Sequence, residues 1–274
     1  MEANLQRRIQ RYGWDKAADA YEAGWKQSLA AAQSELLLRA DASPGEHVLD
    51  IACGTGLVTL PLAHAVGREG RVIATDLSAR MVDLLRIEAE VRGLAQVEAF
   101  RADTETLSGV ADGSVDLVTC ALGLMYVPEP RRALAEALRV LKPGGRAVFA
   151  VWGERRHCGW SEIFPIVDAR VKSEVCPLFF RLGTGAALSV EMEEAGFYGI
   201  GGTRLRTSLH YRDDRAALEA AFVGGPVALA YARFDAAVRE AVHAEYLQSI
   251  APFRTEGRYQ IPGEFVVNWG FKPV

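Results

Sequence analysis

The 274-residue sequence lacks several features that would assign it to whole classes of protein. It has only four cysteines, which are widely scattered, so it indicates no disulfide framework and favours a reducing cytoplasm. It has no uncharged apolar run long enough to span a membrane, and its first residues lack the apolar core of a signal peptide. These absences predict a cytoplasmic protein that has no membrane partner.

An excess of positive charge is also missing. The formal net charge is −4, with 31 Lys and Arg against 35 Asp and Glu, and no run of Lys or Arg reaches five residues. A surface that binds nucleic acid normally shows a basic excess, so we predict no nucleic-acid partner. There is no His-x-x-x-His or Cys-x-x-Cys pair either, and we therefore predict no metal.

Two nucleotide-binding fingerprints are incomplete. The turn Gly54-Thr55-Gly56 follows an apolar, β-branched run at 48–52 and precedes a helical pattern. The dinucleotide fingerprint G-x-G-x-x-G needs a third glycine, and Thr59 stands at that position. The phosphate loop needs Gly-Lys-Ser or Gly-Lys-Thr, which does not occur. An NAD(P)-dependent oxidoreductase is therefore retained only as an alternative.

Strands and helices alternate along the middle of the chain. After the run at 48–52, strand patterns occur at 71–76, 97–101, 115–120 and 146–152, with helical patterns between them, for example at 79–92 and 130–141. Strands separated by single helices imply right-handed crossovers and a parallel sheet. With two further strands expected at 203–210 and 261–269, we predict an α/β, doubly wound, mostly parallel seven-stranded sheet that carries helices on both faces.

Three acidic residues stand at the ends of the first three predicted strands. Asp76 lies 20 residues beyond Gly56, where a carboxylate can accept hydrogen bonds from both hydroxyls of a ribose. The plainer alternative is an acid that favours a helix N-terminus. Asp103 could accept a hydrogen bond from an exocyclic amine while the backbone of Thr104 meets a ring nitrogen, although such pairs also form simple turns. Asp50 is the acid just before the glycine turn.

With these motifs, residues 48–152 resemble the class I S-adenosylmethionine (SAM) methyltransferases. The likeness is to the small-molecule group typified by the ubiquinone- and menaquinone-biosynthesis C-methyltransferases, and it covers about two fifths of the chain. Ala52 departs from the pattern, because it stands where the family motif has its first glycine. The ordered matches are Leu49-Asp-Ile-Ala-Cys-Gly-Thr-Gly56, Thr75-Asp-Leu-Ser78, Ala102-Asp103, Asp112-Gly-Ser-Val-Asp-Leu-Val118 and Arg139-Val-Leu-Lys-Pro-Gly-Gly145.

The resemblance implies a Rossmann-like methyltransferase fold, SAM as cofactor and S-adenosylhomocysteine (SAH) as product. It implies that the small residues of the turn pass the methionine and ribose of SAM, and that Leu77 and Met81 flank its adenine. Cys120 and Ala121 would meet the methionine moiety, which Tyr21 would cover. The cofactor-binding residues that it implies are Tyr21, Asp50, Ala52, Gly54, Gly56, Asp76, Leu77, Met81, Asp103, Thr104 and Cys120.

The implied reaction moves a methyl group to an O, N, S or C atom of a small-molecule acceptor, with aromatic, quinone-like or secondary metabolites favoured. Such a site mainly aligns the reactants, and it needs a base only if the acceptor must lose a proton. Tyr126 and His157 are the catalytic candidates, with His210 as a further possible base; for a lone histidine, packing is the alternative. A non-catalytic SAM-binding protein would share the same acids. The acceptor, the methylated atom and the oligomeric state are not given by the sequence.

Four regions are expected along the chain. Residues 1–45 are predicted to form an N-terminal helical lid whose aromatic stripe either packs on the sheet or closes over the ligand. Residues 46–152 would form the SAM-binding α/β core, and 153–185 an aromatic-rich lid and substrate insertion. Residues 186–274 would complete the sheet and add further helices.

Overall fold

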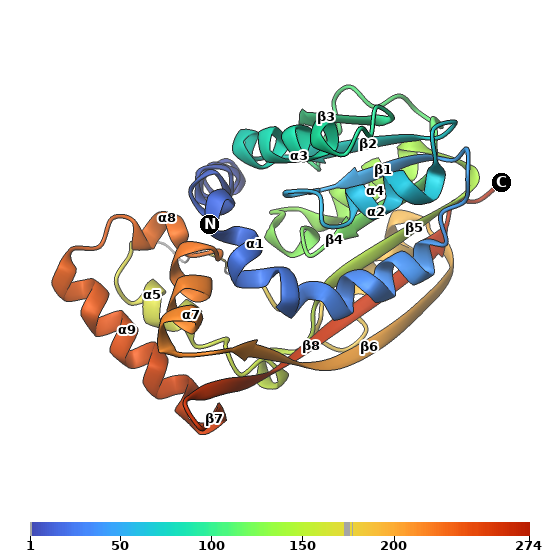
Figure 1. The fold of residues 1–274 in the computed structure, drawn as a ribbon. Coiled ribbons are helices and arrows are strands. Elements are labelled where there is room, and N and C mark those ends of the chain that lie inside the picture. The colour runs from blue at the N-terminus through green and yellow to red at the C-terminus, as the bar shows by residue number, and fades with distance from the viewer. Residues whose placement is uncertain (1, 173–175, 177) are drawn as a thin grey trace.

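The computed structural model describes residues 2–172, 176 and 178–274, so the first residue of the predicted lid and parts of the predicted insertion (173–175 and 177) lie outside the described residues. A central sheet has the strand order β3-β2-β1-β4-β5-β8-β6, and a short β7 pairs with β8 (Figure 1). The strands are β1 (His47–Ile51), β2 (Arg71–Asp76), β3 (Val97–Arg101), β4 (Val115–Ala121), β5 (Leu141–Trp152), β6 (Tyr198–Tyr211), β7 (Arg254–Thr255) and β8 (Arg258–Phe271).

The pairing confirms the predicted doubly wound, mostly parallel sheet. Strands β1 to β5 pair in parallel, and β8 lies antiparallel between β5 and β6. The seven strands of the main path match the predicted number; the two-residue β7 was not predicted, because so short a strand leaves no alternating pattern.

Helices cover both faces of the sheet. One buried apolar cluster joins α2, α3 and the C-terminal part of α1 to the strands, and another joins α4, α6 and the aromatic residues after β5. No helix within the described ranges is both long enough and apolar enough to cross a membrane. The α-helices are α1 (Ala3–Ala40), α2 (Thr59–Val66), α3 (Ala79–Val91), α4 (Pro130–Val140), α5 (Ile163–Asp168), α6 (Ala187–Ala195), α7 (Asp214–Leu218), α8 (Ala228–Tyr231) and α9 (Ala236–Ile250). Single turns are η1 (Leu124–Tyr126), η2 (Arg155–His157), η3 (Glu219–Val223) and η4 (Ala251–Phe253).

The ends of these helices follow local sequence signals. The Ser78 hydroxyl accepts a hydrogen bond from the backbone N–H of Met81 and so caps α3, as predicted. Pro130 occupies the first turn of α4, where a missing N–H costs nothing. Gly196 adopts the left-handed conformation that ends α6.

The long strands β6 and β8 run beyond the parallel strands toward a group of helices, α5, α7, α8 and α9, at the lower left of Figure 1. Helix α1 packs against α8 of this group and against η3, the turn that follows α7. The approach is close, because a Cβ atom on Gly24 would lie 2.9 Å from Ala220 Cα. Residues 186–274 therefore do more than complete the sheet: part of them forms the surface on which α1 rests.

Candidate functional site

The turn after β1 presents bare backbone at the carboxyl end of the sheet. It lies where the strand order reverses between β1 and β4, the usual position of ligands in open α/β sheets. Ala52 has φ 54°, in the left-handed region that favours glycine. Its methyl group fits because residue 123 is glycine: a Cβ on Gly123 would lie 2.3 Å from Ala52 Cβ. An alanine can therefore replace the first glycine of the motif here, because Gly123 on the facing loop leaves space for its methyl group.

The two glycines of the turn have different roles. A Cβ on Gly54 would meet only the Tyr21 ring, at 3.9 Å, so this backbone is open to a ligand. A Cβ on Gly56 would lie 2.4 Å from Leu85 Cδ1, so Gly56 allows α3 to pack closely. Gly56 does not line the cleft described below, and its contact with the cofactor stays a prediction.

Asp76, at the end of β2, faces this turn. Its Oδ2 accepts a hydrogen bond from the Gly54 N–H at 2.9 Å, and its Oδ1 accepts one from the Ser78 N–H at 2.8 Å. Burial raises the pKa of Asp76 to about 6, although these two hydrogen bonds favour the ionised form. An ionised carboxylate has about four acceptor positions, so two remain for a ligand.

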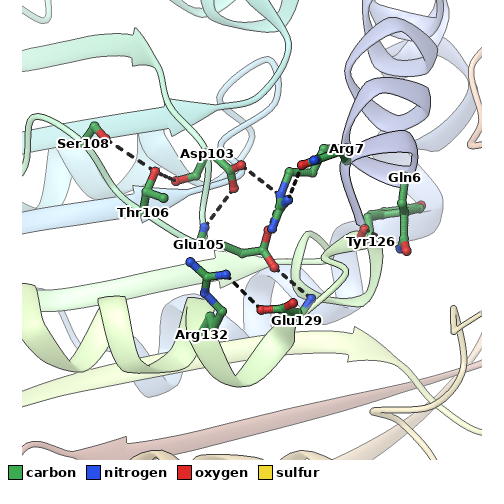
Figure 2. A network of polar contacts seen from close by, with 10 residues as sticks. Gln6, Arg7, Asp103, Glu105, Thr106, Ser108, Tyr126, Glu129 and Arg132 are labelled. Carbon is green, nitrogen blue, oxygen red and sulfur yellow. Dashed lines mark hydrogen bonds and ion pairs between the residues drawn. The ribbon is translucent and has the colours of Figure 1, made fainter. Parts of the chain in front are cut away.

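Asp103, after β3, is held by the N-terminal part of α1 (Figure 2). Its Oδ1 accepts a hydrogen bond from the Glu105 N–H at 2.9 Å, and its Oδ2 lies 3.2 Å from Arg7 Nε. Arg7 also pairs with Glu105, which is only 3% exposed. The Glu105 carboxylate also accepts a hydrogen bond from the Glu129 N–H at 2.8 Å. We call Arg7, Asp103 and Glu105 the α1 latch.

Asp50 lies behind the turn and not in the cleft. Its Oδ2 accepts a hydrogen bond from the Thr59 hydroxyl at 2.6 Å, and its Oδ1 accepts one from the Thr119 hydroxyl at 2.8 Å. Burial raises the pKa of Asp50 to about 6. Asp50 thus ties β1 to α2 and β4, and its contact with the cofactor stays a prediction. Thr59, at the position of the absent third glycine, is one of the two groups that hold it.

Most of the other predicted residues line one cleft, with an empty volume of about 720 Å³ counted with its open mouth. The predicted residues that it brings together are Tyr21, Ala52, Gly54, Asp76, Leu77, Met81, Asp103, Thr104, Ala121 and Tyr126.

The cleft also has lining residues that were not predicted as site residues. They are Arg7, Gln10, Trp14, Leu122, Gly123, Val127 and Pro128. The first three share one face of α1 with Tyr21, since their spacings of three, four and seven residues follow the helical period. That period could have identified Arg7 and Gln10 from the sequence.

A smaller cavity, which we call the inner chamber, adjoins the cleft. It has an empty volume of about 310 Å³ and shares Trp14, Tyr21, Leu122 and Tyr126 with the cleft. The Trp14 ring stands edge-on to Tyr21 at 5.8 Å and to Tyr126 at 5.2 Å, measured between ring centroids. Its remaining lining residues are Trp25, Leu29, Met125, Trp152, Trp160 and Pro226.

Cys120 and the histidines lie elsewhere. Cys120 is fully buried, and burial raises the pKa of its thiol to about 12. Its neighbour Ala121 lines the cleft, and Cys120 does not. Nδ1 of His157 lies 2.9 Å from Oε2 of Glu264, a buried residue of β8, and His157 lines neither cavity. His210 is exposed on β6. His157 therefore lies beside Glu264 and outside both cavities, and its catalytic role stays a prediction. Within the described residues, no group of three or more His, Cys, Asp or Glu side chains is arranged to hold a metal ion.

Comparisons with known proteins match the core of this architecture. A family model described as a methyltransferase domain matches residues 48–145. Residues 48–145 thus resemble a methyltransferase domain. Demethylmenaquinone methyltransferase of Bacillus cereus is 38% identical over 108 residues, which cover 39% of this chain and 45% of that enzyme. The chain thus spans less than half the length of the first curated relatives that it matches.

Solved structures share the fold over most of the chain. A candidate methyltransferase of Bacillus halodurans superposes with a TM-score of 0.63 at 22% identity, covering 89% of this chain and 100% of that one. Phosphoethanolamine N-methyltransferase 2 of Haemonchus contortus, solved with phosphomonomethylethanolamine and SAH, superposes with a TM-score of 0.61 at 18% identity, covering 95% of this chain and 58% of that one.

The methyltransferase domain supplies only part of the two cavities. It carries the turn, Asp76, Asp103 and Tyr126, whereas α1 lies outside the matched range and adds Arg7 and Tyr21. The deeper wall of the inner chamber comes from α1, the end of β5, the segment after it and Pro226.

Proposed function

We propose that this protein transfers the methyl group of SAM to a small-molecule acceptor. The observation that carries the proposal is one continuous arrangement: a cleft with a carboxylate at Asp76 and another at Asp103 opens beside an aromatic chamber. A methyl donor and its acceptor need two adjacent sites of this kind, one polar and elongated and the other shaped by the acceptor.

The cleft suits SAM in its donors and acceptors. The free acceptor positions of Asp76 would take the two ribose hydroxyls, while Leu77 and Met81 pack against the adenine. Asp103 and the Thr104 backbone would meet the adenine edge. Ala52 and Gly54, which leave the backbone bare, would pass the ribose and methionine.

Tyr21 and Ala121 would enclose the methionine end, next to the inner chamber. When bound, SAM supplies an activated methyl group on a sulfonium, so the protein needs no metal for this chemistry. The side chains of this chain align the reactants and exclude water, which together can lower the barrier by about 7–11 kcal/mol.

Tyr126 is the catalytic candidate that lines the cleft. It lines both cavities, and burial raises the pKa of its hydroxyl well above the ordinary value, so the group keeps its proton. It would orient the acceptor by donating a hydrogen bond and would not act as a base. Tyr126→Phe should lower turnover more than it weakens SAM binding.

The test is a screen of amines, phenols, quinones and thiols with purified protein and SAM, in which formation of SAH is measured. We expect at least one acceptor class to produce SAH in step with a methylated product. SAM binding without methyl transfer to any acceptor class would instead indicate a SAM-binding protein that does not catalyse. We also propose that the protein is cytoplasmic and that residues 1–45 and 153–185 form its lid.

A further inference from the structure

Trp160 belongs to the wall of the inner chamber, and its indole N–H is unused there. The residue is 2% exposed, and its Nε1 has no hydrogen-bond partner among the residues that the structure describes. The same group on Trp25, another residue of this wall, donates a hydrogen bond to the Ala220 carbonyl oxygen at 3.1 Å. A buried N–H without a partner is costly, and folded proteins usually supply one. Trp160 therefore needs an explanation that Trp25 does not.

The neighbours of Trp160 explain why its N–H is left without a partner in the protein. Other aromatic rings surround it, from Trp152 at 4.7 Å to Phe180 at 5.9 Å between ring centroids. The side chains of tryptophan and phenylalanine carry no hydrogen-bond acceptor. The rings around Trp160 are those of Trp25, Trp152, Phe164, Phe179 and Phe180. A partner for this N–H must therefore come from a bound molecule.

The rest of the chamber wall indicates what that molecule offers. Tyr21 and Tyr126 also line it, and burial raises the pKa of both hydroxyls above the ordinary value, so they keep their protons and can donate. Among the residues that the structure describes, no Lys, Arg, His, Asp or Glu lines the chamber. An uncharged oxygen can accept hydrogen bonds from such a wall. A carboxylate would lose its hydration there without a cation to pair with.

We propose that Trp160 selects the acceptor by donating its N–H to an uncharged oxygen, a carbonyl or a hydroxyl, on an apolar body. This inference rests on the proposed function and assigns a specificity-determining residue to it. Trp160 lines the chamber and not the cleft, whereas Tyr126 lines both. The oxygen therefore lies away from the methyl donor and serves recognition, separate from the atom that receives the methyl group. Trp160 also lies outside the matched range 48–145, in the predicted substrate insertion.

The experiment compares three probes of similar size: acetophenone, α-methylstyrene and benzoate. α-Methylstyrene has the shape of acetophenone with a CH₂ group in place of the oxygen, and benzoate is charged. Their dissociation constants are measured by NMR titration of protein that carries isotope-labelled tryptophan, with SAH present to fill the cleft. We expect benzoate to bind more weakly than acetophenone. Tighter binding of benzoate, or no binding of acetophenone to the SAH complex, would overturn the inference.

The same spectra report on the N–H itself. The Trp160 indole signal is the one that is missing from the Trp160→Phe variant. A hydrogen bond deshields the proton, so this signal should move downfield when acetophenone binds and should not do so with α-methylstyrene. A signal that stays in place at saturation with acetophenone would show that the N–H remains directed at the neighbouring rings, and it would refute the proposed contact.

Two matched variants localise the effect. We define the oxygen preference as the dissociation constant of α-methylstyrene divided by that of acetophenone. Trp160→Phe keeps a ring and removes the N–H, so the oxygen preference should fall about fivefold, the loss of one hydrogen bond. Trp25→Phe is the control, because it makes the same change on the same wall at an N–H that is already bonded to Ala220. It should leave the oxygen preference unchanged, and equal losses in the two variants would contradict the assignment.

The two proposals fail in different ways. If calorimetry detects no binding of SAM or SAH, the methyltransferase function itself is refuted. If SAH binds and the oxygen preference is the same in Trp160→Phe as in the unmodified protein, only the role of Trp160 is refuted.

Discussion

At the scale of single residues, the site depends on contacts between two residues, of which a sequence motif contains only one. Ala52 occupies a left-handed position, and Gly123 leaves the space for its methyl group. Gly123 itself has φ −102°, a value that alanine adopts freely, so the glycine is required by the contact and not by its own backbone.

This pair predicts a specific non-additivity. Gly123→Ala should lower the free energy of unfolding by about 1–3 kcal/mol, because the new methyl overlaps that of Ala52. In an Ala52→Gly background the same change should cost much less, since the opposing methyl is gone. Urea unfolding of the four proteins measures this, and equal costs in both backgrounds would contradict the predicted contact.

Asp76 gives the second prediction at this scale. With a pKa of about 6, the carboxyl is mostly ionised at pH 7.5 and mostly protonated at pH 5, where it loses acceptor positions. SAM affinity should therefore fall as the pH is lowered through about 6. Asp76→Asn should bind SAM more weakly at pH 7.5, by about 1.5–3 kcal/mol, and should show a flatter pH profile.

The control for Asp76 is Asp83→Asn. Asp83 is exposed on α3, where it faces Arg86 at 3.6 Å, and it lines no part of the cleft. A pH profile for Asp76→Asn that matches the unmodified protein would assign the titration to another group, such as Asp50.

At the scale of elements, helix α1 connects the cofactor cleft with the rest of the molecule. Its first turns carry Arg7 to the α1 latch and Trp14 to the boundary between the cavities, and its middle rests on η3. Because one face of α1 covers the cleft, we expect a ligand to leave only when the N-terminal half of this helix moves.

Breaking the α1 latch should therefore speed release. Arg7→Met removes the partner of the buried Glu105 and should raise the dissociation rate of SAH about tenfold, measured by stopped-flow displacement. Arg7→Lys should release SAH at a rate between those of Arg7→Met and the unmodified protein. Arg8→Met, a change at an exposed neighbour on the same helix, should leave the rate unchanged. Equal rates for Arg7→Met and Arg8→Met would show that the latch does not control release.

How far the sequence predicts the site differs between kinds of element. Order and spacing were sufficient for the parallel strands, and thus for Asp76 and Asp103, because strand ends meet at one edge of a sheet. Order and spacing could not predict that Asp50 and Gly56 lie outside the cleft lining. Their positions depend on contacts with Thr59 and Leu85, respectively.

Contacts between residues distant in sequence were beyond sequence reasoning. His157 lies beside Glu264, 107 positions later, and no local pattern joins the two. In the same way, Pro226 reaches the inner chamber only because α1 packs on the helices that the β6 and β8 strands support.

At the scale of the whole molecule, the methyltransferase domain and its surroundings divide the work. The domain at 48–145 contributes most of the cleft, while α1 and the segments after β5 build the chamber. Under the proposed function, the core would bind the methyl donor and the added parts would select the acceptor.

The central claim is that the cleft between Asp76 and Asp103 binds SAM. Its most direct test is calorimetric titration of the purified protein with SAM, SAH and NADH at pH 7.5. The account predicts one site per chain for SAM and for SAH, weakened in Asp76→Asn, and no binding of NADH. Binding of NADH without binding of SAM or SAH would contradict it.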